Sequence, residues 1–546
     1  MTTPETALLP DDGEPPEGYL GADARVRSGP AAELIEAGYE LELADMWLLH
    51  RGLGLADLAH VIALSEHGEI PAEDAAVLLR GLLELHELPP NRLEVDSRYG
   101  DLYNVRERWL EQRVGTAAGW LSAGRPRREA GRIAFRVALR GRVLELAAAA
   151  ARFGTALVDL ATRERDTVMP DYTYLQAAQP TTVGHWILSF AYVVLRDLDR
   201  LHGDLMWVDR SPAGAGGVNG SRFRLDRPRL AGLLGFPAEI EHTRDAMWQV
   251  DGFAELGAHA ALAAVGASRF AEDLELYGTS EFGLLRIGDE LCRASALMPQ
   301  KRNPYALVVL RGGAGTLIGR STGLLATQRT SSGRTDNLMY AYGELAGSVD
   351  LAARLLRLAA ATAESVTVDH EAMRRATTEG FTQAADLAEA ITRATDLDYR
   401  SAYRVVGRAV ADAIDAGEGP EGLTAGELDA ASRAVLGREL HVDPALVSDA
   451  LDPVAALATR VVRGGAAPTP MDAMLGECAT ALAAASRWID EGRERIGTAE
   501  EALVALAESR AADAAEWRSR HPAPVPLEDP DVAPDDAARQ GGPPSR

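Results

Sequence analysis

Apolar residues recur at intervals of three and four along most of the chain, the spacing of one face of an α-helix. Five stretches keep this pattern for much longer than the ~11–12 residues of an average helix. They cover residues ~130–165, ~182–209, ~243–279, ~304–328 and ~337–363. Aromatic residues make up only 5% of the chain, while Ala and Leu are abundant, a composition that favours helices over strands. The pattern predicts an all-α fold built on an elongated bundle of five long helices.

Several of the predicted helices are apolar on more than one face, as in Leu144–Arg152 and Ala258–Ala267. A helix of this kind must be covered on more than one face. The simplest arrangement is a homo-oligomer with closed symmetry, whose subunits pool their long helices into one larger bundle. Smaller helical regions flank the five long helices, at about 30–115 and 366–518.

The two ends of the chain differ in composition from its middle. The first ~25 residues are acidic and rich in Pro and Gly, and the tail from about Arg520 is rich in Pro, so we expect both to be disordered. The expected division is a disordered lead-in (1–25), an N-terminal helical domain (26–115), a central long-helix domain (116–365), a C-terminal helical domain (366–518) and a disordered tail (519–546).

Charge and cysteine content narrow the class of protein. The formal net charge is −25, so nucleic acid is not an expected partner, although a local arginine cluster can still bind a small anion. Two cysteines are too few for a disulfide framework, and no C-x-x-C or H-E-x-x-H motif indicates a metal site. The chain has no secretory signal and no uncharged apolar stretch of the ~18 residues that a membrane span needs. We therefore expect a cytoplasmic protein without a membrane partner.

One lysine, Lys301, stands among 56 basic residues, and all the others are arginine. It lies in the distinctive segment Ser295-Ala-Leu-Met-Pro-Gln-Lys-Arg-Asn303-Pro. A compact ammonium can approach one small anionic oxygen as a point charge, whereas a planar guanidinium needs more room and prefers forked partners. Retention of a single lysine therefore indicates a specific role, with chance retention on the surface as the alternative.

Three further polar segments lie between the predicted helices, at Gly100–Asn104, Ser122–Glu129 and Asp171–Pro180. Arg127 and Arg128 supply forked donors suited to carboxylates, with a solvated surface arginine as the alternative for each. Thr173 and Asn303 supply neutral hydrogen bonds. Ser295 is a candidate nucleophile or base, with a turn or cap serine as the alternative.

The sequence argues against two common kinds of site. No histidine lies in these four segments, so a hydrolase triad is not indicated. The glycine-rich run Gly214–Gly220 lacks the spacing of a dinucleotide-binding loop and follows no predicted strand, so we interpret it as a turn. With a hydrolase triad and a dinucleotide-binding loop not indicated, the sequence favours an enzyme that uses acid–base chemistry without a cofactor.

These segments resemble the fumarase/aspartase superfamily, and specifically its argininosuccinate lyase branch. Residues Ser295–Pro304 are similar to the signature loop of that family. The resemblance covers about residues 30–470 and includes, in order along the chain, the segments 172–180, 212–220, 271–283, 366–374, 380–387 and 464–468.

The resemblance implies a β-elimination that forms fumarate from a small anionic dicarboxylate substrate, without a cofactor. It implies Ser295 as the base in a mobile loop, Lys301 and Asn303 as the groups that hold the carboxylate on which charge builds up, and Thr173 and Arg127 as ligands of the other carboxylate. It also implies a three-domain fold and a homotetramer whose active sites gather loops from three subunits. Residues in matching segments that we count as substrate-binding are Met298, Gln179 and Arg128.

Several family residues are replaced in this chain. The family's histidine after the threonine is Tyr174, and the glutamate that pairs with that histidine is Val308. We count Tyr174 with the catalytic residues, either as a weak acid or as a residue that only fills the histidine's space. Tyr103 replaces another histidine, and Arg128-Glu129 replace an asparagine–aspartate pair, which suggests a more anionic substrate or leaving group.

The stretch 333–341 corresponds to the family segment that receives the arginine half of argininosuccinate, but it lacks the family's tyrosine, glutamine and lysine. We therefore expect a lyase that releases fumarate from a succinyl-type substrate, such as an N-substituted aspartate or a nitro-type succinate, whose leaving group is not arginine. The alternatives are a plain argininosuccinate lyase and a non-catalytic structural or binding member of the family.

Overall fold

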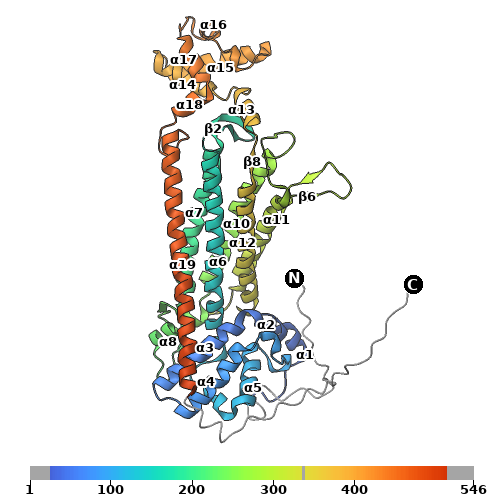
Figure 1. Cartoon of the computed structure of the whole chain (residues 1–546), viewed down its shortest axis with the longest axis vertical. Coiled ribbons are helices and arrows are strands. Elements are labelled where there is room, and N and C mark those ends of the chain that lie inside the picture. Colours follow the sequence, from blue (N-terminus) through green and yellow to red (C-terminus); the bar gives the residue numbers. More distant parts are fainter. Residues whose placement is uncertain (1–24, 335–337, 513–546) are drawn as a thin grey trace, which may run out of the picture.

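The computed structural model describes residues 25–334 and 338–512, and it is elongated and almost entirely helical (Figure 1). The N-terminal helices pack at one end of the long bundle. They are α1 (Ala32–Leu34), a π-helical turn (Ile35–Tyr39), α2 (Glu40–Ala44), α3 (Met46–Glu66), α4 (Ala72–Glu87) and α5 (Leu102–Val114). The two termini that the sequence predicts to be disordered lie outside the described residues, apart from Arg25.

The long bundle confirms the all-α prediction. It is formed by α6 (Arg127–Arg163), α7 (Val183–Val208), α10 (Asp251–Tyr277), α11 (Tyr305–Thr327) and α12 (Met339–Ser365), which pack side by side. Fully buried leucines such as Leu139, Leu256 and Leu345 fill the space between these helices. Each such side chain contributes about 1.5–3 kcal/mol of burial free energy, which makes the bundle a firm scaffold for the loops at its ends. None of the described helices is long and apolar enough to cross a membrane.

The predicted helix 243–279 is interrupted, so the prediction of one continuous helix is wrong at this point. It consists of α9 (Thr243–Trp248) and α10, separated by Gln249 and Val250, and the backbone leaves the helical conformation at Gln249 with ψ 132°. At the start of α10, Gly252 lies against the ring of Trp207, where an added Cβ would come within 2.2 Å of a ring atom. This close contact fixes the orientation of the first turn of α10 against Trp207.

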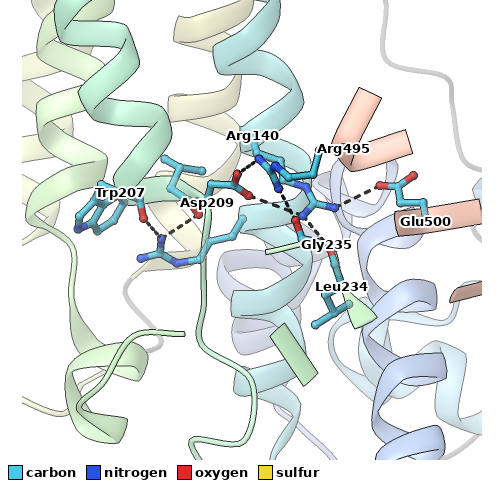
Figure 2. Close-up of polar contacts among 9 residues, drawn as sticks. Arg140, Trp207, Asp209, Leu234, Gly235, Arg495 and Glu500 are labelled. Carbon is cyan, nitrogen blue, oxygen red and sulfur yellow. Dashed lines mark hydrogen bonds and ion pairs between the residues drawn. The ribbon is translucent and has the colours of Figure 1, made fainter. Parts of the chain in front are cut away.

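Buried arginines tie the bundle together at its lower end (Figure 2). Arg140 of α6 donates to the carbonyl oxygen of Leu234 at 2.8 Å, just after α8 (Arg227–Leu233), and pairs with Glu500 at 3.4 Å. Asp209, directly after α7, forms ion pairs with both Arg140 and Arg495. Because a buried charge is costly unless it is paired, this network fixes the elements that carry its members relative to one another.

The C-terminal helices form a head at the opposite end of the bundle from the N-terminal helices (Figure 1). They are α13 (His370–Thr378), α14 (Ala384–Ala394), α15 (Tyr399–Ala416), α16 (Ala425–Leu436), α17 (Pro444–Leu451) and α18 (Pro453–Ala458). A separate hydrophobic core that includes Leu387, Val405 and Leu428 holds the head together.

The long helix α19 (Pro468–Ala512) leaves the head and runs back along the bundle. It packs on α6, α7 and α4, and its buried Cys478, Leu482 and Ile489 belong to the main hydrophobic core. The sequence predicts a C-terminal domain over 366–518, which would include α19. The apolar residues of α19 are buried against the bundle and the N-terminal helices, and the domain boundaries stay predictions.

The strands are short, and they connect helices at the ends of the bundle. β1 (Val168–Thr173) and β2 (Gln176–Thr182) form an antiparallel hairpin between α6 and α7. β6 (Arg293–Ala294) and β7 (Arg302–Asn303) form a second antiparallel hairpin before α11. Two further pairs are β3 (Arg210–Ser211) with β4 (Ala238–Glu239), and β5 (Leu285–Arg286) with β8 (Thr367–Val368). The two hairpins carry most of the site residues that the sequence predicts.

Candidate active site

Ser295 and Lys301 are the first and last residues of the loop that joins β6 to β7. The last pair of this hairpin joins Ala294 to Arg302, directly before and after that loop. Asn303 closes the base of this hairpin, because its side-chain amide donates to the carbonyl oxygen of Arg293 at 2.9 Å. Three of the predicted site residues are therefore held in one small unit.

Ser295 makes the hydrogen bonds of a turn serine. Its Oγ accepts from the backbone N–H of Met298 at 2.9 Å and from that of Leu297 at 3.3 Å. Ser295 therefore fits the alternative of a turn serine. These hydrogen bonds are also compatible with a role of Ser295 as the base. Both N–H groups point at the oxygen that would carry negative charge if Ser295 were deprotonated.

The rest of this loop is open to solvent in the single chain. Lys301 is exposed, and its side chain makes no hydrogen bond or ion pair with the described residues. The side chains of Leu297 and Met298 are 85% and 39% exposed. The hairpin projects sideways from the bundle (Figure 1). It cannot enclose a substrate by itself, so other segments must complete the site.

Thr173, Tyr174 and Gln179 lie on the β1–β2 hairpin. Tyr174 and Leu175 form its turn with φ of 54° and 56°, a pair of left-handed conformations that suits the twist of a two-residue hairpin turn. Tyr174 is 99% exposed, and Thr173 and Gln179 are exposed as well. The predicted catalytic tyrosine therefore stands at the tip of a hairpin, without a covering group from the described part of the chain.

Arg127 and Arg128 begin α6, at the end of the bundle where the N-terminal helices pack. Arg127 contacts Asp101 at 3.5 Å. Arg128 holds the carboxylate of Glu42 in a forked pair, with distances of 2.6 and 3.1 Å, and lies 3.6 Å from Asp101. In the single chain, the charge of Arg128 is thus already paired with Glu42. The more anionic substrate or leaving group that we expect from Arg128 stays a prediction.

The buried carboxylate of Glu129 shapes the neighbouring glycine-rich turn. It accepts the backbone N–H groups of Gly214 and Gly216, both at 2.6 Å, and burial raises its pKa. Gly216 has φ +60°, and an added Cβ would lie 2.3 Å from the carbonyl oxygen of Gly220. The prediction that this run forms a turn is confirmed, and glycine is required there.

The predicted residues form groups at opposite ends of α6. The β1–β2 hairpin follows its last residue, and Arg127 is its first. A helix of 37 residues is about 54 Å long at 1.5 Å per residue. Since a small dicarboxylate cannot bridge this distance, Thr173 and Arg127 of one chain cannot hold the same substrate molecule.

Two carboxylates beside Arg127 and Arg128 could not be predicted from the sequence. Glu42 and Asp45 lie at the end of α2, and both face the start of α6 or α12. No motif marks them, because they are two of 81 acidic residues in the chain. Their position near the arginines follows only from the packing of the N-terminal helices on the bundle.

Comparison with known proteins places the chain in a family. A lyase family model matches residues 57–319, and a model of the argininosuccinate lyase C-terminal region matches residues 381–458. The chain is 32% identical over 420 residues to argininosuccinate lyase of Methanothermobacter thermautotrophicus, covering 76% of this chain and 88% of that protein. It is 33% identical over 429 residues to argininosuccinate lyase of Halobacterium salinarum, covering 77% of this chain and 85% of that protein.

Solved structures show the same fold. A variant of EDDS lyase with bound fumarate superimposes with a TM-score of 0.79 at 24% identity, over 93% of this chain and 100% of that chain. A fumarate lyase from Mesorhizobium sp. gives a TM-score of 0.65 at 19% identity, over 82% of this chain and 98% of that chain. Together with the matching sequences, these likenesses define the class: the chain belongs to the fumarase/aspartase superfamily of lyases.

Within that superfamily the chain is a member of the argininosuccinate lyase-like branch, and it is a carbon–nitrogen lyase that forms fumarate. The family, the fold class and the reaction class that the sequence predicted are confirmed.

Proposed function

We propose that this lyase releases fumarate by β-elimination from an N-substituted aspartate or related succinyl compound whose leaving group is not arginine. The observation that supports the proposal is the β6–β7 hairpin, which carries Ser295 and Lys301 at the two ends of its loop and Asn303 at its base. Replacement of the arginine-receiving residues in the stretch 333–341 supports a different leaving group.

Ser295 acts as the base in this proposal. It removes a proton from the carbon next to a carboxylate, the C–N bond breaks with its electron pair going to nitrogen, and the leaving nitrogen takes up a proton. A serine can do this only as an alkoxide, and hydrogen bonds to a charged form favour that form. The N–H groups of Leu297 and Met298 supply two such bonds to Oγ.

Lys301 and Asn303 stabilise the intermediate. Proton removal places a second negative charge on the neighbouring carboxylate, and preorganised donors aimed at this charge lower the barrier. The free ammonium of Lys301 suits this role because no group in the described part of the chain neutralises it. Thr173 and Arg127 bind the other carboxylate, Met298 and Gln179 complete the binding loops, and Tyr174 protonates the leaving group or fills that space.

The site requires more than one copy of the chain, because Arg127 and Thr173 lie at opposite ends of α6, a helix about 54 Å long. The family resemblance implies that the assembly is a homotetramer. One face of α11 supports such an assembly. The apolar side chains of Val308, Ile318 and Leu325 are more than half exposed on this helix. Gly312 and Gly319 leave open space where a partner helix could approach closely.

We keep the expectation of a cytoplasmic enzyme with a small anionic substrate.

True argininosuccinate lyase is the second candidate. The relatives named above favour it, since both carry that name and are 32–33% identical to this chain. The fold likeness to EDDS lyase makes EDDS a substrate to test beside argininosuccinate.

The test is fumarate formation, followed by its ultraviolet absorbance, from argininosuccinate, EDDS, a set of N-substituted aspartates and nitrosuccinate. We expect fumarate from at least one compound other than argininosuccinate, and a loss of at least about 100-fold in kcat for Ser295→Ala. Ser280→Ala, which alters an exposed serine in a nearby loop, is the matched control and should retain full activity. Turnover of argininosuccinate at about 1 s⁻¹ or faster would contradict the proposed leaving group.

A further inference from the structure

An open cavity of about 590 Å³ lies beside the start of α6, between the loop that precedes this helix and the glycine-rich turn. Its charged lining consists of three arginines and one glutamate, namely Arg125, Arg127, Arg222 and Glu107. The cavity is thus a basic pocket in a chain whose formal net charge is −25. Its volume falls within the range of about 300–1,000 Å³ that is typical of small-molecule sites.

The three guanidinium groups are not equally available. Arg125 is buried and forms an ion pair with the carboxylate of Asp57 at 2.6 Å. Arg127 lies 3.5 Å from Asp101, a longer contact that leaves part of its side chain exposed. Arg222 is exposed, and its side chain forms no hydrogen bond or ion pair with the described residues. The cavity therefore keeps one cation that no carboxylate in the described part of the chain matches.

Packed neighbours hold the backbone on both sides of Arg222. A Cβ on Gly124 would come within 2.2 Å of the Oγ of Ser221, so the loop before α6 directly contacts the residue that precedes Arg222. On the other side, Arg224 forms an ion pair with Glu69 at 2.6 Å. The backbone of Arg222 is therefore held at the wall of the cavity, while its guanidinium stays available.

Glycines keep the opposite part of this wall open. Gly217 and Gly220 line the cavity with φ of +84° and +85°, and nothing lies within 4 Å of a Cβ built on either residue. The buried carboxylate of Glu129 holds the same turn by accepting the N–H groups of Gly214 and Gly216. The turn thus combines a fixed backbone with open space for a ligand.

Arg127 connects the cavity to the reaction, because it lines the wall and is the residue proposed to bind a substrate carboxylate. A second cavity adjoins Arg127 on the side of Asp45 and Asp101, but its volume is only about 40 Å³. That space has room for a few water molecules, not for a substituent of several atoms. A substrate held by Arg127 therefore has room for its nitrogen substituent only in the larger of these two cavities.

We infer that the larger cavity receives the nitrogen substituent of the substrate, and that Arg222 binds an oxyanion, a carboxylate or a phosphate, carried by this substituent. A guanidinium suits this role because two of its N–H groups can hold two oxygens of such a group. The inference rests on the proposed function and names the chemical class of its leaving group. The anionic leaving group that the sequence suggests thereby gains a binding residue other than Arg128, whose charge Glu42 already matches.

Three substrates of similar size test the charge of the substituent. N-(carboxymethyl)aspartate has an anionic substituent, N-(2-hydroxyethyl)aspartate a neutral one and N-(2-aminoethyl)aspartate a cationic one. Fumarate release should follow this order in kcat/KM for the unaltered enzyme, with a preference of about 10-fold or more for the anionic compound over the neutral one. Arg222→Gln should lower kcat/KM for the anionic compound by about 10-fold or more and change the neutral one by less than about 3-fold.

Arg222→Gln is expected to retain the fold, because the side chain is exposed and makes no polar contact with the described residues. The matched control is Arg229→Gln on α8, which removes the same charge from a guanidinium that pairs with Glu66 at 3.0 Å and does not line the cavity. It should leave the preference unchanged. No preference in the unaltered enzyme, or an equal loss for all three substrates in Arg222→Gln, would overturn the inference while leaving the proposed lyase activity intact.

Binding separates a failure of this inference from a failure of the proposed function. Butane-1,2,4-tricarboxylate has the shape of N-(carboxymethyl)aspartate with carbon in place of nitrogen, so it has no C–N bond to break. Even if none of the three compounds yields fumarate, which would count against the proposed function, its Kd should be about 10-fold or more below that of succinate. This difference should vanish in Arg222→Gln. A difference that is absent from the unaltered enzyme, or that persists in the variant, would overturn the site.

Inorganic phosphate distinguishes a substrate substituent from a separate anion as the ligand. Melting temperatures of the unaltered enzyme and of Arg222→Gln are measured with and without phosphate. Stabilisation that is lost in Arg222→Gln, with the substrate preference present, agrees with one oxyanion position at Arg222. The same stabilisation without any preference among the substrates would assign the cavity to a free anion and overturn its role in holding the leaving group.

Discussion

Single residues decide the chemistry of this site, and Lys301 shows how. The sequence marks it because every other cation is arginine, and in the structure it is an exposed residue at the end of the loop that begins with Ser295. Asp45 shows the opposite case. Nothing near it in the sequence distinguishes it, since its hydrogen-bond partner, the N–H of Gly343, comes from α12, 298 positions away. Local patterns can reveal a residue type that is rare, but not which of many acids a distant segment contacts.

Lys301→Arg tests the proposed point-charge role. A guanidinium keeps the charge but cannot reach a single oxygen in the same geometry, so we expect kcat to fall by about 100-fold with assembly and thermal stability unchanged. Turnover and the melting temperature of the purified variant are measured together. A variant that loses stability along with activity would instead indicate a structural lysine.

Whole elements follow more directly from the sequence. Helical periodicity predicts the five long helices because each buries a stripe of Leu and Ala along its length. It does not reveal that α19 returns along the bundle. The periodicity of a helix shows which face is buried, but not which helices cover that face. The turn at Tyr174 and Leu175 is equally hidden, since neither residue is one that usually adopts a left-handed backbone.

The packing of α7 against α10 predicts a dependence of stability on pH. Burial raises the pKa of Asp197 on α7 to about 6, above its value in an unfolded chain, even though Arg200 lies 2.7 Å away. Asp197 therefore favours the folded state below about pH 4, and this contribution is lost as the pH rises through 6. Asp197→Asn removes the charge, so it should stabilise the protein by about 1–3 kcal/mol at pH 8 and have little effect at pH 4.

Melting temperatures at both pH values check this prediction. The matched control is Asp199→Asn, an exposed residue two positions along the same helix, which should show no such pH dependence. Equal effects of Asp197→Asn at pH 4 and pH 8 would mean that the carboxyl group titrates normally.

At the scale of the whole molecule, the long helices separate the site residues. Ser295 and Lys301 share one hairpin, but Arg127 begins α6 and Thr173 follows its far end, and this helix is about 54 Å long. The β6–β7 hairpin also lies nearer the head than the start of α6 does (Figure 1), so we propose that one fumarate-forming site combines the Ser295 loop of one copy with Arg127 of another. Exposed apolar and glycine residues along α11 offer a surface on which copies can meet.

Mixing two inactive variants tests this claim most directly. Ser295→Ala and Arg127→Ala are each prepared, dissociated together in equal amounts and reassembled, and fumarate release is measured on the best substrate of the panel. After random mixing, half of the sites receive an intact Ser295 and, independently, half receive an intact Arg127. About one quarter of the sites, and of the unaltered activity, should therefore return. Mixed assemblies that form but remain as inactive as the separate variants would contradict a site shared between copies.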